Sequence, residues 1–192
     1  MTREELIAFE ADIAAEFNNG RIKFPIHLDG GNEDQLIEVF KNIKPTDWCF
    51  CSWRSHYRAL LHGIPPEKVK AAIMAGHSIT LCWPEYRFFS SAIVGGNLPI
   101  ALGVALSIKR RGGSDYVFAF LGDMTARAGI FHECISYAMG QGLPIRFIVE
   151  DNGKSVCTDT QAAWGTGRKL KIEEFHYDLP FPHSGAGVRV VF

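Results

Sequence analysis

Two apolar runs that flank one helical segment constrain the fold of this chain more than any other feature. The runs cover residues 116–121 and 145–149, and each has the length of a buried strand. Between them, apolar residues recur at helical spacings of three and four, at Ile130, Phe131, Cys134, Tyr137 and Ala138. Gly140, Gly142 and Pro144 then end the helix. Two strands joined by one helix predict a right-handed βαβ unit, so we expect the strands to be parallel.

Polar residues follow the end of each predicted strand. Gly122-Asp123 comes directly after the first strand, and Asp151-Asn152 follows the second. Because parallel strands finish at the same edge of a sheet, we expect Asp123 and Asn152 to lie close together. Carboxylate, amide and backbone carbonyl oxygens are hard ligands of the kind that Mg²⁺ takes, and the N-terminus of the connecting helix favours an anion. The pattern therefore predicts a Mg²⁺–diphosphate site at the carboxyl edge of the sheet.

Each of these two motifs also has an ordinary structural interpretation. Gly-Asp after a strand is common turn chemistry, and Asp-Asn-Gly is a standard turn signal. Taken singly, either motif is more often structural than functional. Their occurrence together, on two strands that flank one helix, favours the binding site.

The same stretch resembles the thiamine diphosphate motif, in which GDG is followed downstream by NN. The chain is similar to the alpha subunit of the dehydrogenase component of 2-oxo acid dehydrogenase complexes, and Gly129 and Glu133 match the G-x-x-x-E of that subunit's helix. The resemblance implies that Asp123, Asn152 and the backbone carbonyl of Lys154 hold the metal ion.

Two residues depart from the family's motif. Met124 replaces the third glycine of GDG, and Asp151 replaces the first asparagine of NN. Neither change removes a metal ligand, but Met124 adds bulk where the diphosphate would lie. By the same resemblance, Gly122, Asp123 and Met124 together form the part of the cofactor site that follows the first strand.

Two segments nearer the N-terminus extend the resemblance. HLDGGNED is similar to a family stretch, HLSxGQEA, whose histidine reaches the cofactor diphosphate, which implies this role for His27, although a histidine beside glycines is also common in turns and cores. After a predicted short strand at 48–52, the family has Tyr-Arg-x-His, and this chain has Trp53, Arg54 and His56. In the family the aromatic residue and the arginine hold phosphate, and the histidine faces the reacting carbon. A guanidinium suits a diphosphate, but an arginine after a strand is by itself usually a solvated residue.

The segment 77–91 has no clear periodicity, and we expect an ordered loop there. Where the family has the histidine of a Ser-Met-His stretch, this chain has Thr80, which can donate a hydrogen bond but cannot shuttle protons near neutral pH. Further on, Ala92 and Val94 match a family loop that gives backbone carbonyls to the aminopyrimidine ring. The neighbouring glycines are equally consistent with tight packing at the entrance of the next helix.

The rest of the chain contains further predicted helices. Thr2 with Glu5 forms a capping box for a helix with one apolar face, at Leu6, Phe9, Ile13 and Phe17. We expect further helices at 33–42 and 66–75, and a long one that the segment 92–99 leads into and that ends at 109–112. A charged solvated segment is expected at 168–174, a Pro/Gly-rich loop at 179–187 and a last strand at 188–192. The resemblance, which covers roughly the first four-fifths of the chain, implies an α/β fold with a doubly wound, mostly parallel sheet and helices on both faces.

The composition excludes several classes of function. Of the 192 residues, 47% are hydrophobic and the net charge is −1, which excludes a disordered chain and a basic surface for nucleic acid. We expect a single domain over 1–192 and neither a membrane span nor a secretory signal. The five cysteines are odd in number and lie mostly in apolar runs, which indicates reduced core residues and a cytoplasmic location.

The resemblance implies a subunit that binds Mg²⁺ and the diphosphate of thiamine diphosphate in a two-chain enzyme. Such an enzyme cleaves or decarboxylates a 2-oxo acid and transfers the acyl or aldehyde unit, with His56 and Thr80 at the catalytic positions. The implied partner is a beta-like subunit that supplies the pyrimidine-binding domain and an activating glutamate, in a heterotetramer. Two alternatives stay open: one half of a split transketolase or carboligase acting on a ketose, and a degenerate subunit that only supports assembly. A nicotinamide-binding domain is disfavoured because no G-x-G-x-x-G follows the first strand of a βαβ unit.

Overall fold

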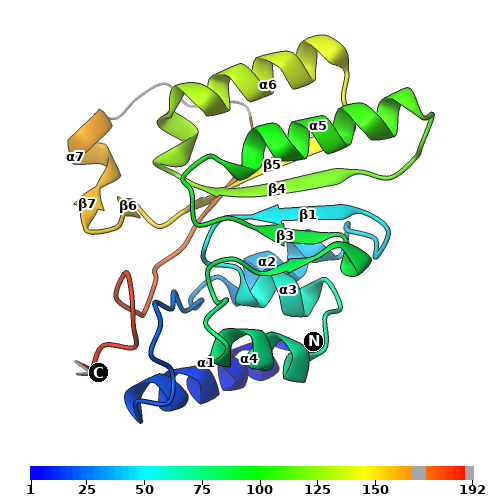
Figure 1. Ribbon diagram of the computed structural model, residues 1–192. Helices are drawn as coiled ribbons and strands as arrows, with labels where there is room; N and C mark the ends of the chain where they lie inside the picture. The colour runs from blue at the N-terminus through cyan, green and yellow to red at the C-terminus, as the bar shows by residue number, and fades with distance from the viewer. Residues whose placement is uncertain (166–171, 189–192) are drawn as a thin grey trace.

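The computed structural model describes residues 1–165 and 172–188 and shows a parallel sheet between two layers of helices (Figure 1). In strand order β2-β3-β1-β4-β5-β8, all neighbours in the sheet pair in parallel except β2 and β3. The strands are β1 (Trp48–Cys51), β2 (Cys82–Trp83), β3 (Phe88–Ser90), β4 (Val117–Gly122), β5 (Ile145–Asp151) and β8 (Glu173–His176). The expected α/β fold with a doubly wound, mostly parallel sheet is confirmed.

Helices cover both faces of this sheet (Figure 1). One layer contains α1 (Arg3–Asn18), α2 (Glu33–Phe40), α3 (His56–Leu61) and α4 (Pro66–Met74), and the other contains α5 (Asn97–Arg110) and α6 (Gly129–Gln141). The smaller elements are the 3₁₀ turns η1 (Pro84–Tyr86) and η2 (Thr125–Arg127), the hairpin strands β6 (Lys154–Ser155) and β7 (Thr158–Asp159), and α7 (Thr160–Trp164). In the described ranges, none of the helices combines the length and the apolar character that crossing a bilayer requires.

The β4–α6–β5 unit has the predicted topology. Val117 pairs with Ile145 and Gly122 with Glu150, so the two strands run in parallel and end at the same edge. The helix begins at Gly129, one residue before Ile130, and η2 lies between it and β4. Its buried face consists of Phe131, Cys134 and Ala138, whereas Ile130 and Tyr137 are exposed.

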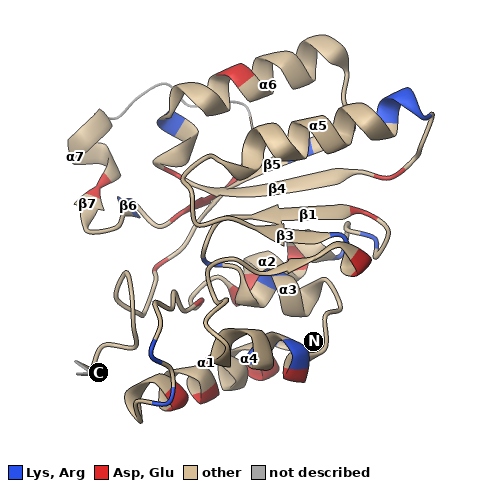
Figure 2. Cartoon of the chain, in the orientation of Figure 1, with Lys and Arg blue, Asp and Glu red and all other residues tan. Residues whose placement is uncertain are grey.

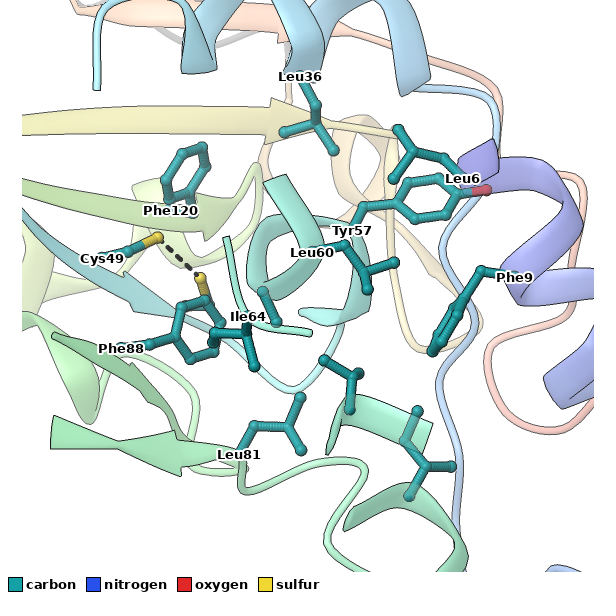
Figure 3. Packing of buried hydrophobic residues seen from close by; sticks show 14 of the residues in the cluster. Leu6, Phe9, Leu36, Cys49, Tyr57, Leu60, Ile64, Leu81, Phe88 and Phe120 are labelled. Carbon is teal, nitrogen blue, oxygen red and sulfur yellow. Dashed lines mark hydrogen bonds between the residues drawn. The ribbon is translucent and has the colours of Figure 1, made fainter. Parts of the chain in front are cut away.

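Alternating side chains of the central strands build one apolar core on each side of the sheet. Cys49, Cys51, Phe118, Phe120 and Ile148 face α1–α4, and the intervening residues of the same strands face α5 and α6. Figure 3 shows the first core, where Phe120 lies near Leu36 and Cys49. Period-two burial on both faces of a strand explains why these strands are continuous apolar runs in the sequence.

The N-terminal helix has the predicted cap and apolar face. Thr2 Oγ1 accepts the N–H of Glu5 at 3.2 Å, and the Glu5 carboxylate accepts the N–H of Thr2 at 2.7 Å. Leu6, Phe9 and Ile13 are buried, and Phe9 and Leu6 point into the core in Figure 3. Capping and a one-sided apolar stripe together set where this helix begins and which face it docks.

Three expectations about the fold need correction or lie outside the described residues. The segment 77–91 is not a loop throughout, because it contains β2, η1 and β3, and β3 pairs with β1. With only three residues, β3 is too short to show a period. Cys82 and Cys157 are exposed, so the expected core placement was wrong for these two cysteines, although all five are free. The predicted strand at 188–192 and most of the charged segment at 168–174 fall in residues that the structure does not describe, whereas Glu173 and Glu174 belong to β8.

A buried ion cluster connects the helical layer to the sheet. Arg58 of α3, only 1% exposed, forms ion pairs with Asp29 and with Glu150 of β5. Asp29 also accepts the N–H of Tyr57 at 3.0 Å and donates its own N–H to Glu10 of α1 at 2.9 Å. Elsewhere the charges of both signs are distributed over both helical layers (Figure 2). The cluster therefore joins α1, the loop after it, α3 and the end of β5.

Replacing Arg58 is expected to destabilise the protein strongly. Arg58→Met leaves two buried carboxylates without a cation, and removing one partner from such a cluster costs about 3–5 kcal/mol. Arg58→Lys keeps the charge but loses the forked geometry, and we expect an intermediate loss. Urea unfolding at neutral pH measures these free energies.

Arg110→Met, at an exposed position of α5, is the matched control and should change the free energy of unfolding by less than about 0.5 kcal/mol. If Arg58→Met unfolded at the same urea concentration as this control, the cluster would not stabilise the fold.

Candidate functional site

A cavity of about 460 Å³ opens at the carboxyl edge of the sheet. The ends of three parallel strands contribute to its wall: Ser52, Trp53 and Arg54 follow β1, Gly122 to Thr125 lie at the end of β4, and Asn152 and Lys154 to Cys157 follow β5. Asp123 and Asn152 therefore line one cavity, as the βαβ topology predicts for two loops at the same edge. Crevices at this position are where open parallel sheets bind ligands.

Asp123 is a buried acidic residue in the wall of this cavity. The residue is only 6% exposed, and its Oδ2 atom is buried and makes no hydrogen bond to the described residues. Burial raises the pKa of Asp123 to about 6. A buried carboxylate oxygen without a partner is costly, and a proton or a cation at that place would relieve the cost.

The loop after β5 orients the predicted amide ligand. Asn152 Oδ1 accepts the N–H of Lys154 at 3.2 Å, and Asp151 Oδ1 accepts the N–H of Gly153 at 2.8 Å. These two turns hold Asn152 and Lys154 beside the cavity. The part of the chain that the structure describes contains no group of three or more His, Cys, Asp and Glu side chains able to hold a metal. A cation here would thus depend on one carboxylate together with amide, carbonyl and ligand oxygens.

Arg54 and His27 meet at a single backbone oxygen. Arg54 Nε donates to the carbonyl of Leu28 at 2.9 Å, and Arg54 Nη2 donates to the carbonyl of His183 at 3.4 Å. His27 Nδ1 lies 2.6 Å from the same His183 oxygen, so Nδ1 carries the proton. Burial lowers the pKa of His27 to about 4, which keeps the imidazole neutral at pH 7. The rings of Trp53 and His183 lie beside it, with centroids 5.8 Å and 4.6 Å from that of His27.

His56 lies in the core rather than in the wall of the cavity. Its Nδ1 is 2.9 Å from Glu10 Oε1, and its Nε2 is 2.9 Å from Ser78 Oγ. Burial by itself lowers the pKa of His56, but the Glu10 carboxylate outweighs it and raises the pKa overall. Both ring nitrogens are thus engaged in a buried chain of hydrogen bonds. The role of His56 at a reacting carbon stays a prediction.

Four other predicted residues also lie outside the wall of this cavity: His27, Thr80, Ala92 and Val94. Of these, His27 contacts the wall through the carbonyl of His183. Thr80 is exposed in the turn before β2, where its N–H donates to the carbonyl of His77 at 3.0 Å. Ala92 and Val94 are exposed in the loop that precedes α5. Their assignments to catalysis and to the aminopyrimidine ring stay predictions.

The sequence analysis missed residues that form a large part of the wall. Residues 177–179 and 181–183 line one side of the cavity, and Arg58 and Glu150 also reach it. Glu150 could have been noticed as an acidic residue that directly follows the apolar run 145–149. Arg58, four residues after Arg54, could have been noticed as a second arginine close to it in the sequence. Nothing in the Pro/Gly-rich composition of 179–187 indicates where that segment lies.

Residues 1–168 match a protein-family model described as the dehydrogenase E1 component. The chain belongs to this family. It is 31% identical over 160 residues to the "Pyruvate dehydrogenase E1 component subunit alpha" of Rickettsia prowazekii (strain Madrid E), which covers 78% of this chain and 49% of that protein. It is 29% identical over 193 residues to the "Pyruvate dehydrogenase E1 component subunit alpha-3, chloroplastic" of Arabidopsis thaliana, covering 89% of this chain and 45% of that protein.

The resemblance inferred from the motifs is thus confirmed at the level of the family. This E1-family chain spans about half the length of the curated relatives it matches. The matched region includes every residue assigned above from the motifs, from His27 to Lys154.

The low pKa of His27 predicts a specific dependence of stability on pH. The unfolded histidine takes up a proton near pH 6.5, whereas the folded one does so only near 4, so this group lowers the free energy of unfolding as the pH falls between those values. Relative to pH 7, the loss at pH 4.5 should be roughly 2 kcal/mol smaller in His27→Asn than in the wild type. Urea unfolding at both pH values tests this, and equal losses in the two proteins would contradict it.

Proposed function

We propose that this chain is the subunit that binds Mg²⁺ and the diphosphate of thiamine diphosphate in a two-chain enzyme acting on a 2-oxo acid. The observation that carries the proposal is the buried, unpartnered Oδ2 atom of Asp123 in the wall of a cavity that Asn152 and Lys154 share. Membership of the dehydrogenase E1 component family supports it. The names of the relatives favour pyruvate as the 2-oxo acid.

The metal would be held by oxygen atoms from two neighbouring loops. We assign the Asp123 carboxylate, the Asn152 amide oxygen and the Lys154 backbone carbonyl as the protein ligands of Mg²⁺, which prefers hard oxygen donors. Diphosphate oxygens would complete the coordination. Because burial raises the pKa of Asp123 to about 6, the cation competes with a proton, and its affinity should fall below that pH.

The diphosphate would be bound by donors on the opposite side of the cavity. Arg54 has a forked guanidinium suited to a phosphate, Trp53 contributes one indole N–H, and His27 contributes its Nδ1–H. Gly122 and Met124 line the approach to the metal. Met124 replaces a glycine of the family's motif, but its unbranched side chain has the flexibility to fold away from a ligand.

When bound, thiamine diphosphate supplies a carbon nucleophile and an electron sink for cleavage of the bond next to a carbonyl group. Around it, this chain would neutralise the diphosphate charge, orient the thiazolium ring and exclude water. We propose that the backbone carbonyls of Ala92 and Val94 bind the aminopyrimidine amine. His56 and Thr80 are proposed as hydrogen-bond donors near the substrate, and the buried contacts of His56 with Glu10 and Ser78 would have to open for that role.

A beta-like subunit is the proposed partner, supplying the pyrimidine-binding domain and an activating glutamate in a heterotetramer. Large apolar side chains that face solvent around the start of α5 support this: Ile93 is 72% exposed, Val94 53% and Ile100 48%. Apolar groups at such exposure are typical of a surface that another chain covers. We further propose that residues 1–192 form one domain and that the protein works in the cytoplasm.

Two alternatives rest on the departures from the family's motif. Thr80 in place of a histidine favours transfer of the cleaved unit to an aldehyde, as in a split transketolase or carboligase half acting on a ketose. Met124 next to the metal site, together with the burial of His56, favours a degenerate subunit that supports assembly without binding the cofactor.

Asp123 should be essential for binding of the cofactor. In calorimetric titrations with thiamine diphosphate and Mg²⁺, we expect the wild type to bind and Asp123→Ala to show no binding, because the only carboxylate among the proposed ligands is gone. Asp151→Asn restores the family's NN pair next to the ligand, keeps the acceptor for the Gly153 N–H, and should bind as the wild type does.

Equal binding by Asp123→Ala and the wild type would overturn the metal assignment. A wild type that does not bind at any cofactor concentration would favour the degenerate subunit.

The purified chain should not turn over substrate by itself. With thiamine diphosphate, Mg²⁺, pyruvate and an artificial oxidant we expect no turnover, because the activating glutamate belongs to the partner. Adding a co-purified partner should produce turnover. Replacing the oxidant by aldehyde acceptors separates the dehydrogenase from the carboligase. Turnover by the single chain would show that the two-chain proposal is wrong.

A further inference from the structure

A segment from the C-terminal part of the chain, residues 177–187, forms one wall of the cavity with its first part, up to His183. We call this segment the strap. At one end the Tyr177 N–H donates to the carbonyl of Asp151 at 2.9 Å, next to the loop that carries Asn152. At the other end the Gly185 N–H and the Ser184 hydroxyl donate to the carbonyl of Ile26 at 3.1 Å and 3.2 Å. Figure 1 shows it running from the end of β8 down toward α1. The strap therefore connects the two sides of the proposed cofactor site.

The strap packs closely against the loop that follows His27. A Cβ atom on Gly31 would lie 2.0 Å from the carbonyl oxygen of Asp178, and one on Gly30 would lie 2.8 Å from Pro180. At the far end, a Cβ atom on Gly185 would lie 3.2 Å from the ring of Phe17. Because the backbones of Gly31 and Asp178 are in direct contact, the strap is packed in one defined position against this loop.

The strap also engages the groups that would bind the diphosphate. The His183 carbonyl accepts hydrogen bonds from both His27 Nδ1 and Arg54 Nη2. These are donors from two separate loops, directed at one oxygen atom. In chemical terms the His183 oxygen stands where an anionic oxygen of a ligand would be expected, although it carries no net charge.

We propose that the strap is an autoinhibitory competitor of the diphosphate, a role that rests on the proposed function. With the strap seated, His27 and Arg54 have one donor each occupied by His183, and a ligand must displace that carbonyl to use them. A phosphate oxygen is charged, and charge-assisted hydrogen bonds are about twice as strong as neutral ones, so the diphosphate wins the exchange. Only molecules with a released strap can bind the diphosphate, so the apparent affinity equals the intrinsic affinity multiplied by the fraction of such molecules.

Loosening the strap should therefore increase affinity. Gly185 has a φ of +77°, and Gly185→Ala adds both backbone strain and a contact with Phe17, away from the cavity. We expect it to bind thiamine diphosphate with Mg²⁺, and inorganic diphosphate with Mg²⁺, about tenfold more tightly than the wild type, the effect of losing one to two hydrogen bonds that hold the strap. Ser184→Ala removes only the hydroxyl contact with Ile26 and should give a smaller gain. Gly20→Ala, with a similar φ of +70° and open space around it, is the control and should bind as the wild type.

Hydrogen exchange gives a second measurement that does not depend on affinity. The Gly185 amide, bound to the Ile26 carbonyl, should be protected in the free wild type and should lose protection when inorganic diphosphate and Mg²⁺ saturate the site. Persistent protection at saturation, or weaker binding by both strap variants, would identify the strap as a fixed wall and overturn the proposal. If the wild type and all variants failed to bind either ligand, both the proposed function and the strap proposal would be wrong. If the wild type bound the ligands while the Gly185 amide stayed protected, only the strap proposal would be wrong.

Discussion

The buried guanidinium of Arg58 is the interaction on which the geometry of this molecule depends. A cation in the interior is tolerated only when carboxylates surround it, and here Asp29 and Glu150 do so from two different parts of the chain. Asp29 belongs to the loop of His27, and Glu150 lies directly before the Asp151-Asn152 turn. One ion cluster thus sets the distance between the loop of the proposed diphosphate donors and the loop of the proposed metal ligands.

The cluster extends through the helical layer to α1. Glu10 accepts hydrogen bonds from the Asp29 backbone and from His56, and His56 in turn contacts Ser78. Four chain segments that are distant in sequence therefore share one polar network beneath the cavity. Such a network restricts the packing to one arrangement, and of its buried polar side-chain atoms in the described residues only Oε2 of Glu10 is left without a hydrogen bond. The network also accounts for the burial of His56 in the core, because both of its ring nitrogens have partners there.

The cavity above this network has two chemically different sides. The carboxylate of Asp123 lies at the end of β4, while the guanidinium of Arg54 lies after β1 and faces the strap. A cation paired with a polyanion would match both sides at once. The strap spans the same gap with a neutral carbonyl, so the protein closes its cavity in a way that a charged ligand is able to reverse.

The sequence by itself determined the features that depend on neighbouring residues. The β4–α6–β5 unit and the cap and apolar face of α1 follow from spacing, glycine stops and side-chain caps over a few turns. The shared edge of Asp123 and Asn152 follows from the handedness of one βαβ unit. Only the tertiary structure decided the pairing of the short strands β3 and β8, the burial of His56, and the place of the strap. These depend on contacts between distant segments, such as the one from His27 to His183 across 156 positions, whose energy no local pattern records.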